Sequence, residues 1–199
     1  MTGSLRYYIV YKPFGTISQF SAAGDKPTLA TLGSFPNDVY PVGRLDADSE
    51  GLLILTNDTE LNNRLLNPKF KHQRTYLSQV EGVATVEAIN NLSQGVDITI
   101  DGKLYRTLSA NAKVLDQEPT VCERDPPIRY RKTIPTSWIE LTLHEGKNRQ
   151  VRKMTAAVGF PTLRLIRIAI ENITIGTMKP GDVIEIEKDK IYRLLFKKV

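Results

Sequence analysis

The sequence predicts an α+β fold with a mixed, mainly antiparallel sheet flanked by helices. Segments with the composition and alternation of strands outnumber segments with helical periodicity. Several neighbouring strands are joined by short turns, which is typical of antiparallel pairing. The 199 residues contain no repeat, low-complexity tract or linker, so we expect one domain over residues 1–199, or two lobes of that domain that share one sheet.

The chain opens with the features of a strand. Residues 5–11 are rich in aromatic and β-branched side chains, and Pro13 and Gly15 follow them, so we expect a core strand there. Residues 16–41 are richer in Gly, Pro, Ser and Asp, which indicates a connection with a short helix at residues 28–32.

A second buried strand and a helix follow this connection. Residues 52–55 form an uninterrupted apolar run, which is typical of a strand covered on both faces. Asn57 or Asp58 can cap the helix. Leu61 and Leu65 fall on one of its faces, and the next proline ends it.

The middle of the chain contains a strand, a helix and a hairpin. Residues 75–80 alternate as a strand does, and the segment TVEAINNLSQ has helical periodicity up to Gly95. Residues 96–105 are expected to form a hairpin, because Asp101 and Gly102 suit its turn.

The clearest helix lies in residues 145–160, EGKNRQVRKMTAAVGF, where Asn148 is placed to cap the helix and Gly159 to end it. Before it, the prolines of residues 124–137, RDPPIRYRKTIPTS, favour an extended backbone. The remaining strands are expected at residues 109–115, 138–143, 162–168, 172–175 and 182–186.

Positive charge is concentrated in one part of the chain. The formal net charge of +5 alone favours a polyanionic partner only weakly. Residues 124–167, here called the basic window, contain ten Lys and Arg against three acidic residues, so the window carries +7 and the remainder −2. We therefore expect a polyanion to bind at the basic window.

Composition excludes several kinds of site. Cys122 is the single cysteine, which excludes an intramolecular disulfide and zinc sites built from several cysteines. His72 and His144 are too few for most transition-metal sites, and the three acids of residues 46–50 have no fourth ligand nearby. The sequence has no P-loop, dinucleotide-binding glycine motif, nucleophile elbow or HExxH motif, so we expect no metal and no cofactor.

The chain also lacks membrane signals. Neither a signal peptide nor an apolar run near 18 residues is present, so we expect a cytoplasmic protein with no membrane partner. Without coiled-coil heptads or an evident apolar stripe, we expect a monomer.

The segment GRLDADSEGLLILTND, residues 43–58, joins a charged loop to a buried strand. Arg44 and Asp46 are separated by one residue, so their side chains project to the same side of an extended segment. They could pair with each other at an ordinary charged loop tip, or Asp46 could present its carboxylate to a substrate. The second interpretation needs a partner that holds Asp46 charged and in place.

The helix of residues 145–160 could supply that partner. Arg149, Arg152 and Lys153 have i, i+3, i+4 spacing and form one cationic stripe. The opposite, packing side carries Val151, Met154, Thr155 and Val158. A solvated basic face is the simple interpretation. The macrodipole disfavours cations in the first turns of a helix, however, so a bound phosphate or a buried carboxylate would explain them better.

Aromatic residues among basic ones suit an RNA strand, through phosphate contacts and base stacking. In residues 124–138, Tyr130 and Trp138 occur among basic side chains, although Trp138 fits the core of the next strand better. Tyr76, taken alone, fits a core strand position with its hydroxyl at the rim.

Together these motifs resemble one known family. Residues 43–58, with TLRLIRIAI after the basic helix and YYIVYKPFG at residues 7–15, are similar to the bacterial ribosomal RNA pseudouridine synthases of the RsuA family. The similarity extends over residues 7–187, and residues 124–138 most resemble members that act on large-subunit RNA. It implies the pseudouridine synthase fold, with a catalytic cleft on one face. It also implies isomerisation of a uridine in 23S ribosomal RNA without cofactor or metal.

The resemblance implies roles for individual residues. Asp46 would be the catalytic carboxylate, Tyr76 would stack on the target base, and Arg152 would pair with Asp46. Val151 would line the pocket, and Arg44 would contact the RNA. The other basic residues expected to bind the substrate are Lys147, Arg149, Lys153, Arg129 and Arg131.

Many relatives carry an N-terminal S4-type RNA-binding domain, whereas here a strand is expected from residue 5, so we expect no such domain and RNA affinity from the basic window. The target base must leave its stack, and Asp46 either attacks C1′ or assists a glycal-forming elimination. The target uridine stays open, as does the choice between free 23S RNA and an assembling large subunit. Two other classes also stay open: a non-catalytic RNA-binding or ribosome-assembly protein, and an N-glycosidase or metal-assisted hydrolase.

Overall fold

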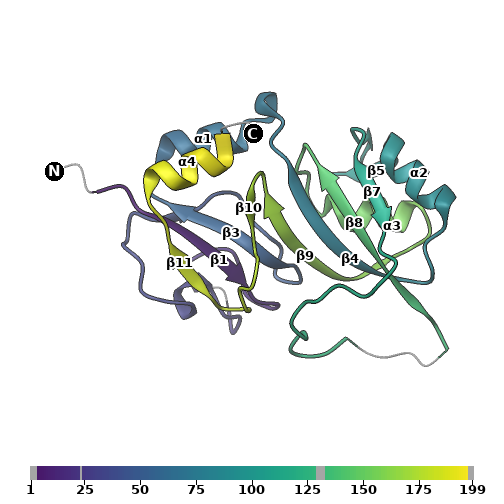
Figure 1. Ribbon diagram of the computed structural model, residues 1–199, viewed down its shortest axis with the longest axis horizontal. Coiled ribbons are helices and arrows are strands. Elements are labelled where there is room, and N and C mark those ends of the chain that lie inside the picture. The colour runs from purple at the N-terminus through teal and green to yellow at the C-terminus, as the bar shows by residue number, and fades with distance from the viewer. Residues whose placement is uncertain (1–3, 23, 129–132, 197–199) are drawn as a thin grey trace. The chain divides into compact units, whose positions relative to one another are not determined.

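The computed structural model describes residues 4–22, 24–128 and 133–196 (Figure 1). Its residues group into two compact units. The first unit comprises residues 1–72 and 167–199, and the second comprises residues 73–166. Strand β9 (Thr162–Ile170) contributes its first residues to the second unit and its last to the first.

The first unit is built on antiparallel strands. Its strands are β1 (Tyr7–Lys12), β2 (Tyr40–Pro41), β3 (Glu50–Thr56), β10 (Ile173–Thr174), β11 (Val183–Glu185) and the end of β9. Strand β1 lies between β11 and β3, and β9 is the next neighbour of β3. The register pairs Tyr7 with Thr56 and Lys12 with Gly51. Two helices, α1 (Thr59–Leu66) and α4 (Lys188–Phe196), and short 3-10 helices at Leu29–Thr31 and Pro68–Phe70 complete the unit.

Strands β1 and β3 are covered on both faces, because their alternate side chains belong to two different hydrophobic cores. On one face, Ile9 and Ile54 pack with Leu61 of α1 and Ile191 of α4, and the two helices lie side by side there (Figure 1). On the other face, the alternate residues of β1 and β3 pack with Leu29. This double burial explains the uninterrupted apolar run at residues 52–55 and confirms the buried strand predicted there.

Asp58 joins three elements of the first unit. Its Oδ1 accepts hydrogen bonds from the Glu60 and Leu61 amides and so caps α1, as predicted. Its Oδ2 accepts 2.7 Å hydrogen bonds from the hydroxyls of Tyr7 on β1 and Tyr192 on α4. Burial opposes ionisation, but these hydrogen bonds outweigh it and lower the pKa of Asp58 below its ordinary value.

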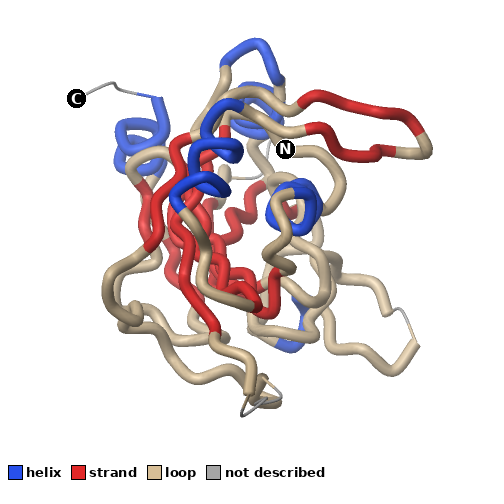
Figure 2. Tube along the Cα trace, turned by 90° about the vertical axis from the view of Figure 1, so that its right-hand side faces the viewer, coloured by secondary structure: helices blue, strands red, loops and turns tan. Residues whose placement is uncertain are grey.

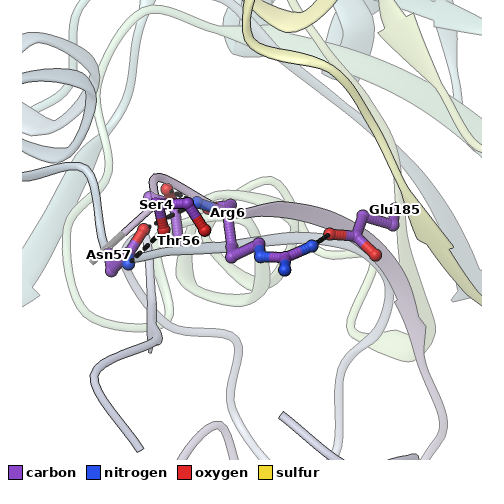
Figure 3. Close-up of polar contacts among 5 residues, drawn as sticks. All are labelled: Ser4, Arg6, Thr56, Asn57 and Glu185. Carbon is purple, nitrogen blue, oxygen red and sulfur yellow. Dashed lines mark hydrogen bonds and ion pairs between the residues drawn. The ribbon is translucent and has the colours of Figure 1, made fainter. Parts of the chain in front are cut away.

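The start of β1 is fixed by polar contacts with the end of β3 and with β11 (Figure 3). The Arg6 amide donates to Asn57 Oδ1 at 2.7 Å, and Thr56 Oγ1 donates to the Arg6 carbonyl at 2.6 Å. Arg6 Nη1 lies 2.7 Å from Glu185 Oε1 in an exposed ion pair. The side chains of Thr56 and Asn57 thus bind the Arg6 backbone just beyond the last ladder position of β1 and β3.

The second unit has an antiparallel sheet of its own. Its elements are β4 (Arg74–Glu81), α2 (Val86–Gln94), β5 (Asp97–Ile100), β6 (Lys103–Arg106), β7 (Asn111–Val114), β8 (Thr136–Leu143), α3 (Gln150–Ala157) and the start of β9. Strand β8 lies between β4 and β7, and β4 is the next neighbour of β9. Strands β5 and β6 form a separate hairpin whose turn residues Asp101 and Gly102 both have positive φ, which confirms the predicted turn.

The predicted α+β class with a mainly antiparallel sheet is confirmed, and strands carry most of the regular backbone (Figure 2). Two predictions about elements are wrong. Helix α3 begins at Gln150 with Arg149, not Asn148, at its N-cap position. The strand predicted near residue 186 is not the last regular element, because helix α4 follows it.

Candidate active site

The acidic loop of the first unit carries Asp46. The loop runs from the end of β2 to the start of β3, and most of its apolar and small residues are buried, including Leu45 at 8% exposure. Asp46 is half-buried and Arg44 is exposed. The Ser49 amide donates to the Asp46 carbonyl at 3.0 Å and closes a turn directly before β3. Asp46 is thus a polar side chain at the surface of a loop that is anchored in the core.

The segment after β1 binds the acidic loop on both sides of Asp46. Ser18 Oγ donates to the Leu45 carbonyl at 2.7 Å and accepts from the Leu45 amide at 3.0 Å. The Gly15 amide donates to the Ala47 carbonyl at 2.7 Å. Sequence reasoning did not select Ser18 or Gly15 for this role, because nothing in their local sequence names a partner 27 or more residues away.

Lys12 at the end of β1 has no exposed surface. Its ammonium donates to the carbonyls of Pro13 at 3.0 Å and Thr16 at 2.7 Å. Burial lowers the pKa of Lys12 to about 8, while the nearby carboxylates of the acidic loop, Glu50 first and then Asp48 and Asp46, oppose that shift. Sequence reasoning missed this buried cation, although its Lys-Pro pair directly after a core strand was a signal.

Two backbones meet beside the acidic loop at Gly51. A Cβ atom at Gly51 would lie 2.3 Å from the carbonyl oxygen of Arg167, so only glycine fits this position. Arg167 is itself buried, and its Nε donates to the Leu52 carbonyl at 2.7 Å. This contact holds the beginning of β3, and with it the end of the acidic loop, against the last part of β9 in the same unit.

The predicted residues of the basic helix lie in the second unit. On α3, Val151 is buried, and Arg152 Nη1 donates to the Thr162 carbonyl at 3.2 Å. The predicted packing side is confirmed for Val151, Met154 and Thr155, while Lys153 is half-buried and Arg149 exposed. Tyr76 lies on β4, opposite Leu141 of β8, and is 8% exposed.

Glu145 and Gln150 fix the start of α3. Gln150 Oε1 accepts from the Lys147 amide at 2.9 Å, and Gln150 Nε2 donates to Glu145 Oε1 at 2.6 Å. Glu145 Oε2 accepts from the Tyr105 hydroxyl of the β5–β6 hairpin at 2.5 Å, and the Lys147 ammonium lies 4.9 Å from the centre of the Tyr105 ring. The hydrogen bond to Glu145, with burial, raises the pKa of Tyr105 to about 12. None of these contacts could be inferred from helical periodicity.

The segment that leads to β8 is also bound within the second unit. Arg164 of β9 is buried, and its Nη2 donates to the Cys122 carbonyl at 2.8 Å. Arg124 Nε donates to the Pro126 carbonyl at 2.8 Å. The predicted RNA-binding residues Arg129 and Arg131 lie outside the described residues.

The structure therefore divides the predicted site residues between the units. Asp46 and Arg44 belong to the first unit, and Tyr76, Val151 and Arg152 belong to the second, as do Lys147, Arg149 and Lys153. The pairing of Asp46 with Arg152 stays a prediction, as does the cleft.

Two kinds of feature are absent from the described part of the chain. Among the described residues, no group of three or more His, Cys, Asp or Glu is arranged to hold a metal ion. Nor does any described helix combine the length and apolar character needed to span a membrane.

Comparisons with known proteins give consistent matches. Residues 6–157 match the family described as RNA pseudouridylate synthase. A ribosomal large subunit pseudouridine synthase E of Xanthomonas axonopodis is 49% identical over 174 residues, which are 86% of this chain and 89% of the relative. The protein of the same name from Vibrio parahaemolyticus is 47% identical over 90% of this chain and 73% of its own length. A crystal structure of a pseudouridylate synthase superposes with a TM-score of 0.77 at 24% identity, covering 96% of this chain and 74% of that one.

Proposed function

Because the chain belongs to the RNA pseudouridylate synthase family, we propose that it isomerises a specific uridine of 23S ribosomal RNA to pseudouridine, with Asp46 as the catalytic carboxylate. Membership confirms the resemblance predicted from the motifs, and it makes the protein an isomerase. The choice of 23S RNA follows the names of the relatives that share 47–49% of their aligned residues with this chain.

The observation that carries the role of Asp46 is its setting. A half-buried carboxylate lies between two residues, Leu45 and Ala47, whose backbones are bound by a separate segment of the chain. A loop that only exposes charged side chains to water does not need its backbone fixed on both sides of one residue. A side chain that must react with one atom of a bound substrate does need this.

The reaction needs one charged carboxylate and a target uracil that has left the base stack of the RNA. The N1–C1′ bond breaks, the uracil turns, a C5–C1′ bond forms, and the C5 proton is lost while N1 gains one, so the product is an isomer of the substrate. Asp46 attacks C1′ directly or removes a ribose proton in a glycal route, and both require the ionised side chain. The target base would stack on Tyr76, and Arg152 would pair with Asp46.

Cations of the second unit would hold the RNA backbone. Arg149 and Lys147 are exposed and Lys153 is half-buried, so phosphates can approach these side chains near the start of α3. Arg44 would add a contact beside the acidic loop, and Val151 would contribute an apolar wall. We further propose that the protein acts in the cytoplasm as a monomer, as one domain over residues 1–199, without cofactor or metal, on free 23S RNA or an assembling large subunit.

The test is tritium release from 23S and 16S RNA that carries 5-tritiated, unmodified uridine. Native protein should release tritium from 23S RNA alone, and Asp46→Asn should abolish the release while keeping RNA binding. Asp48→Asn is the matched control, since it removes a charge from the same loop and should keep most of the activity. Release that persists in Asp46→Asn would refute the proposed role. Free uracil among the products, or inhibition by a chelator, would instead indicate an N-glycosidase or a metal-assisted hydrolase. An RNA-binding protein without activity would release no tritium from either RNA.

A further inference from the structure

We propose that Ser18 is a positioning residue for Asp46, acting through the backbone of the acidic loop. Together with the Gly15 amide, its hydroxyl holds the two residues that flank the carboxylate. The inference rests on the proposed catalytic role of Asp46 and extends it to a residue outside the family motif that contains this aspartate.

The hydroxyl of Ser18 bonds to both polar backbone groups of Leu45. It donates to the Leu45 carbonyl and accepts from the Leu45 amide, at 2.7 and 3.0 Å, so one side chain takes the place of a strand partner. Ser18 is 2% exposed and Leu45 8%, so water cannot easily replace these bonds. On the other side of Asp46, the Gly15 amide donates to the Ala47 carbonyl.

These bonds matter because Asp46 has no strand or helix of its own. Between the end of β2 at Pro41 and the start of β3 at Glu50, the backbone follows no regular element. Besides the turn that the Ser49 amide closes, the position of the carboxylate therefore depends on the contacts that its neighbours make with the segment after β1.

That segment is itself fixed. The Lys12 ammonium binds the carbonyls of Pro13 and Thr16, and the Ile17 amide donates to the Pro27 carbonyl at 2.9 Å. Lys12 also pairs with Gly51 in the β1–β3 ladder. The contacts thus form a closed ring within the first unit, from β1 through residues 13–18 to the acidic loop and back through β3.

Loss of the Ser18 hydroxyl should release one side of this ring. The Leu45 amide and carbonyl would lose their partner, and the loop would shift or sample several positions. Because misplacement by about 1 Å can lower a rate by roughly a hundredfold, we expect the chemical step to slow. RNA affinity should fall far less than the rate, because all the proposed phosphate contacts except Arg44 lie in the second unit.

The experiment compares Ser18→Ala with Ser137→Ala. Ser137 of β8 likewise bridges a backbone carbonyl and a backbone amide in the second unit, although of two residues: it donates to the Gly82 carbonyl at 2.9 Å and accepts from the Ala84 amide at 3.0 Å. Single-turnover tritium release, RNA affinity by filter binding and thermal unfolding are measured for both. We expect Ser18→Ala to lower the rate by roughly 10- to 100-fold with little change in RNA affinity. Ser137→Ala should unfold at a lower temperature but keep its rate.

Two further variants keep the test decisive. Ser18→Thr retains the hydroxyl and should restore most of the rate, whereas Ser18→Cys has a similar size and a weak donor and should lie between serine and alanine. If Ser18→Ala does not fold, the comparison of the cysteine and threonine variants replaces it.

The outcomes separate this inference from the proposed function. If Asp46→Asn remains active, the proposed function fails, and the premise of the inference fails with it. If Asp46→Asn is inactive but Ser18→Ala is as active as Ser137→Ala, only the positioning role is overturned. A loss of rate that is accompanied by an equal loss of RNA affinity would also overturn it, because the serine would then be structural.

Discussion

Among the described glycines of the first unit, Gly51 is the one at which an added Cβ atom would be most crowded. A Cβ atom there would lie 2.3 Å from the carbonyl oxygen and 2.8 Å from the nitrogen of Arg167, and the φ angle is +103°. Both obstacles are backbone atoms, which cannot rotate away as a side chain can. Since Gly51 is the second residue of β3, this close approach fixes where the acidic loop ends.

Gly51→Ala should therefore destabilise the protein far more than an ordinary glycine substitution. We expect a loss of about 3 kcal/mol or more in the free energy of unfolding, measured by denaturant titration. Gly102→Ala is the matched control, since its φ is +76° but nothing lies within 4 Å of an added Cβ. It should lose only about 1–2 kcal/mol, the cost of the left-handed conformation. Equal losses in the two variants would show that crowding against Arg167 is not the cause.

At the same scale, the sequence predicts site residues that belong to long motifs, and it does not reveal the buried polar residues that support them. Asp46 and Arg152 stand in segments whose resemblance to a family is specific. Ser18 stands outside these segments, and Lys12 and Glu145 stand inside them with no role predicted from their local sequence. All three are buried, and Ser18 and Glu145 bind partners 27 and 40 residues away. Such pairings cannot be predicted from one sequence, because local spacing does not encode them.

Helix α3 shows how an element can begin without the residue that local rules prefer. Asn148 is a favoured N-cap type, yet the N-cap position is occupied by Arg149 in the left-handed conformation, with φ 52° and ψ 33°, and its side chain does not cap the helix. Gln150 bonds back to the Lys147 amide instead. A left-handed backbone at a residue with a long side chain is unfavourable, and such strain tends to occur at functional sites.

Replacing Arg149 by glycine should change the stability of the protein and its affinity for RNA in opposite directions. Glycine adopts this conformation freely, so Arg149→Gly should raise the free energy of unfolding by about 1 kcal/mol. The same variant should weaken RNA binding, because it removes a proposed phosphate contact. Lys71→Gly is the control: Lys71 has φ 50° and ψ 43° at the end of a 3-10 helix and has no proposed role in RNA binding. It should gain similar stability and keep its RNA affinity, as measured by denaturant titration and filter binding. An unchanged RNA affinity in Arg149→Gly would show that this arginine is not a phosphate contact.

Helix α4 was missed for a different reason. Ile191 and Leu195 are four residues apart and both are buried, so the helical signal was present. Only two residues separate the helix from β11, and its docking involves the Tyr192 hydroxyl reaching Asp58, which only the folded chain brings near.

At the scale of the whole molecule, the fold class was predictable but the order of strands was not. Periodicity indicated which segments are strands, and short connections indicated antiparallel pairing. Strand β1 nevertheless lies between β3 and β11, whose residues are about 40 and about 175 positions further along the chain. Hydrophobic patterns indicate which face of a strand is buried, but they do not indicate which strands are neighbours. The order of strands could therefore be learned only from the structure.

Lys12 gives the stability of the protein an unusual dependence on alkaline pH. Below about pH 8 the ammonium is charged in both the folded and unfolded states, so the full penalty of burying it is present. Between about pH 8 and its ordinary pKa of 10.5, the folded protein has released this proton while the unfolded chain still holds it. The unfolded state then binds more protons, so this group makes the free energy of unfolding rise with pH, by about 3 kcal/mol over the whole interval.

The tyrosines act in the opposite direction at higher pH. Burial and the hydrogen bonds to Asp58 raise the pKa of Tyr7 and of Tyr192, and the hydrogen bond to Glu145 raises that of Tyr105. Above about pH 10 these groups ionise in the unfolded chain but remain neutral in the folded protein, so they lower stability as pH rises.

Denaturant titrations of native protein and Lys12→Met at half-unit intervals from pH 7 to pH 11 separate the two contributions. The difference in unfolding free energy between the proteins should change in favour of the native one by about 3 kcal/mol between pH 7.5 and 10.5, because only the native protein carries the titrating ammonium. Both curves should fall above pH 10, since both retain the three tyrosines. Parallel curves below pH 10 would mean that the folded protein keeps Lys12 charged, and that the carboxylates of the acidic loop offset its burial completely.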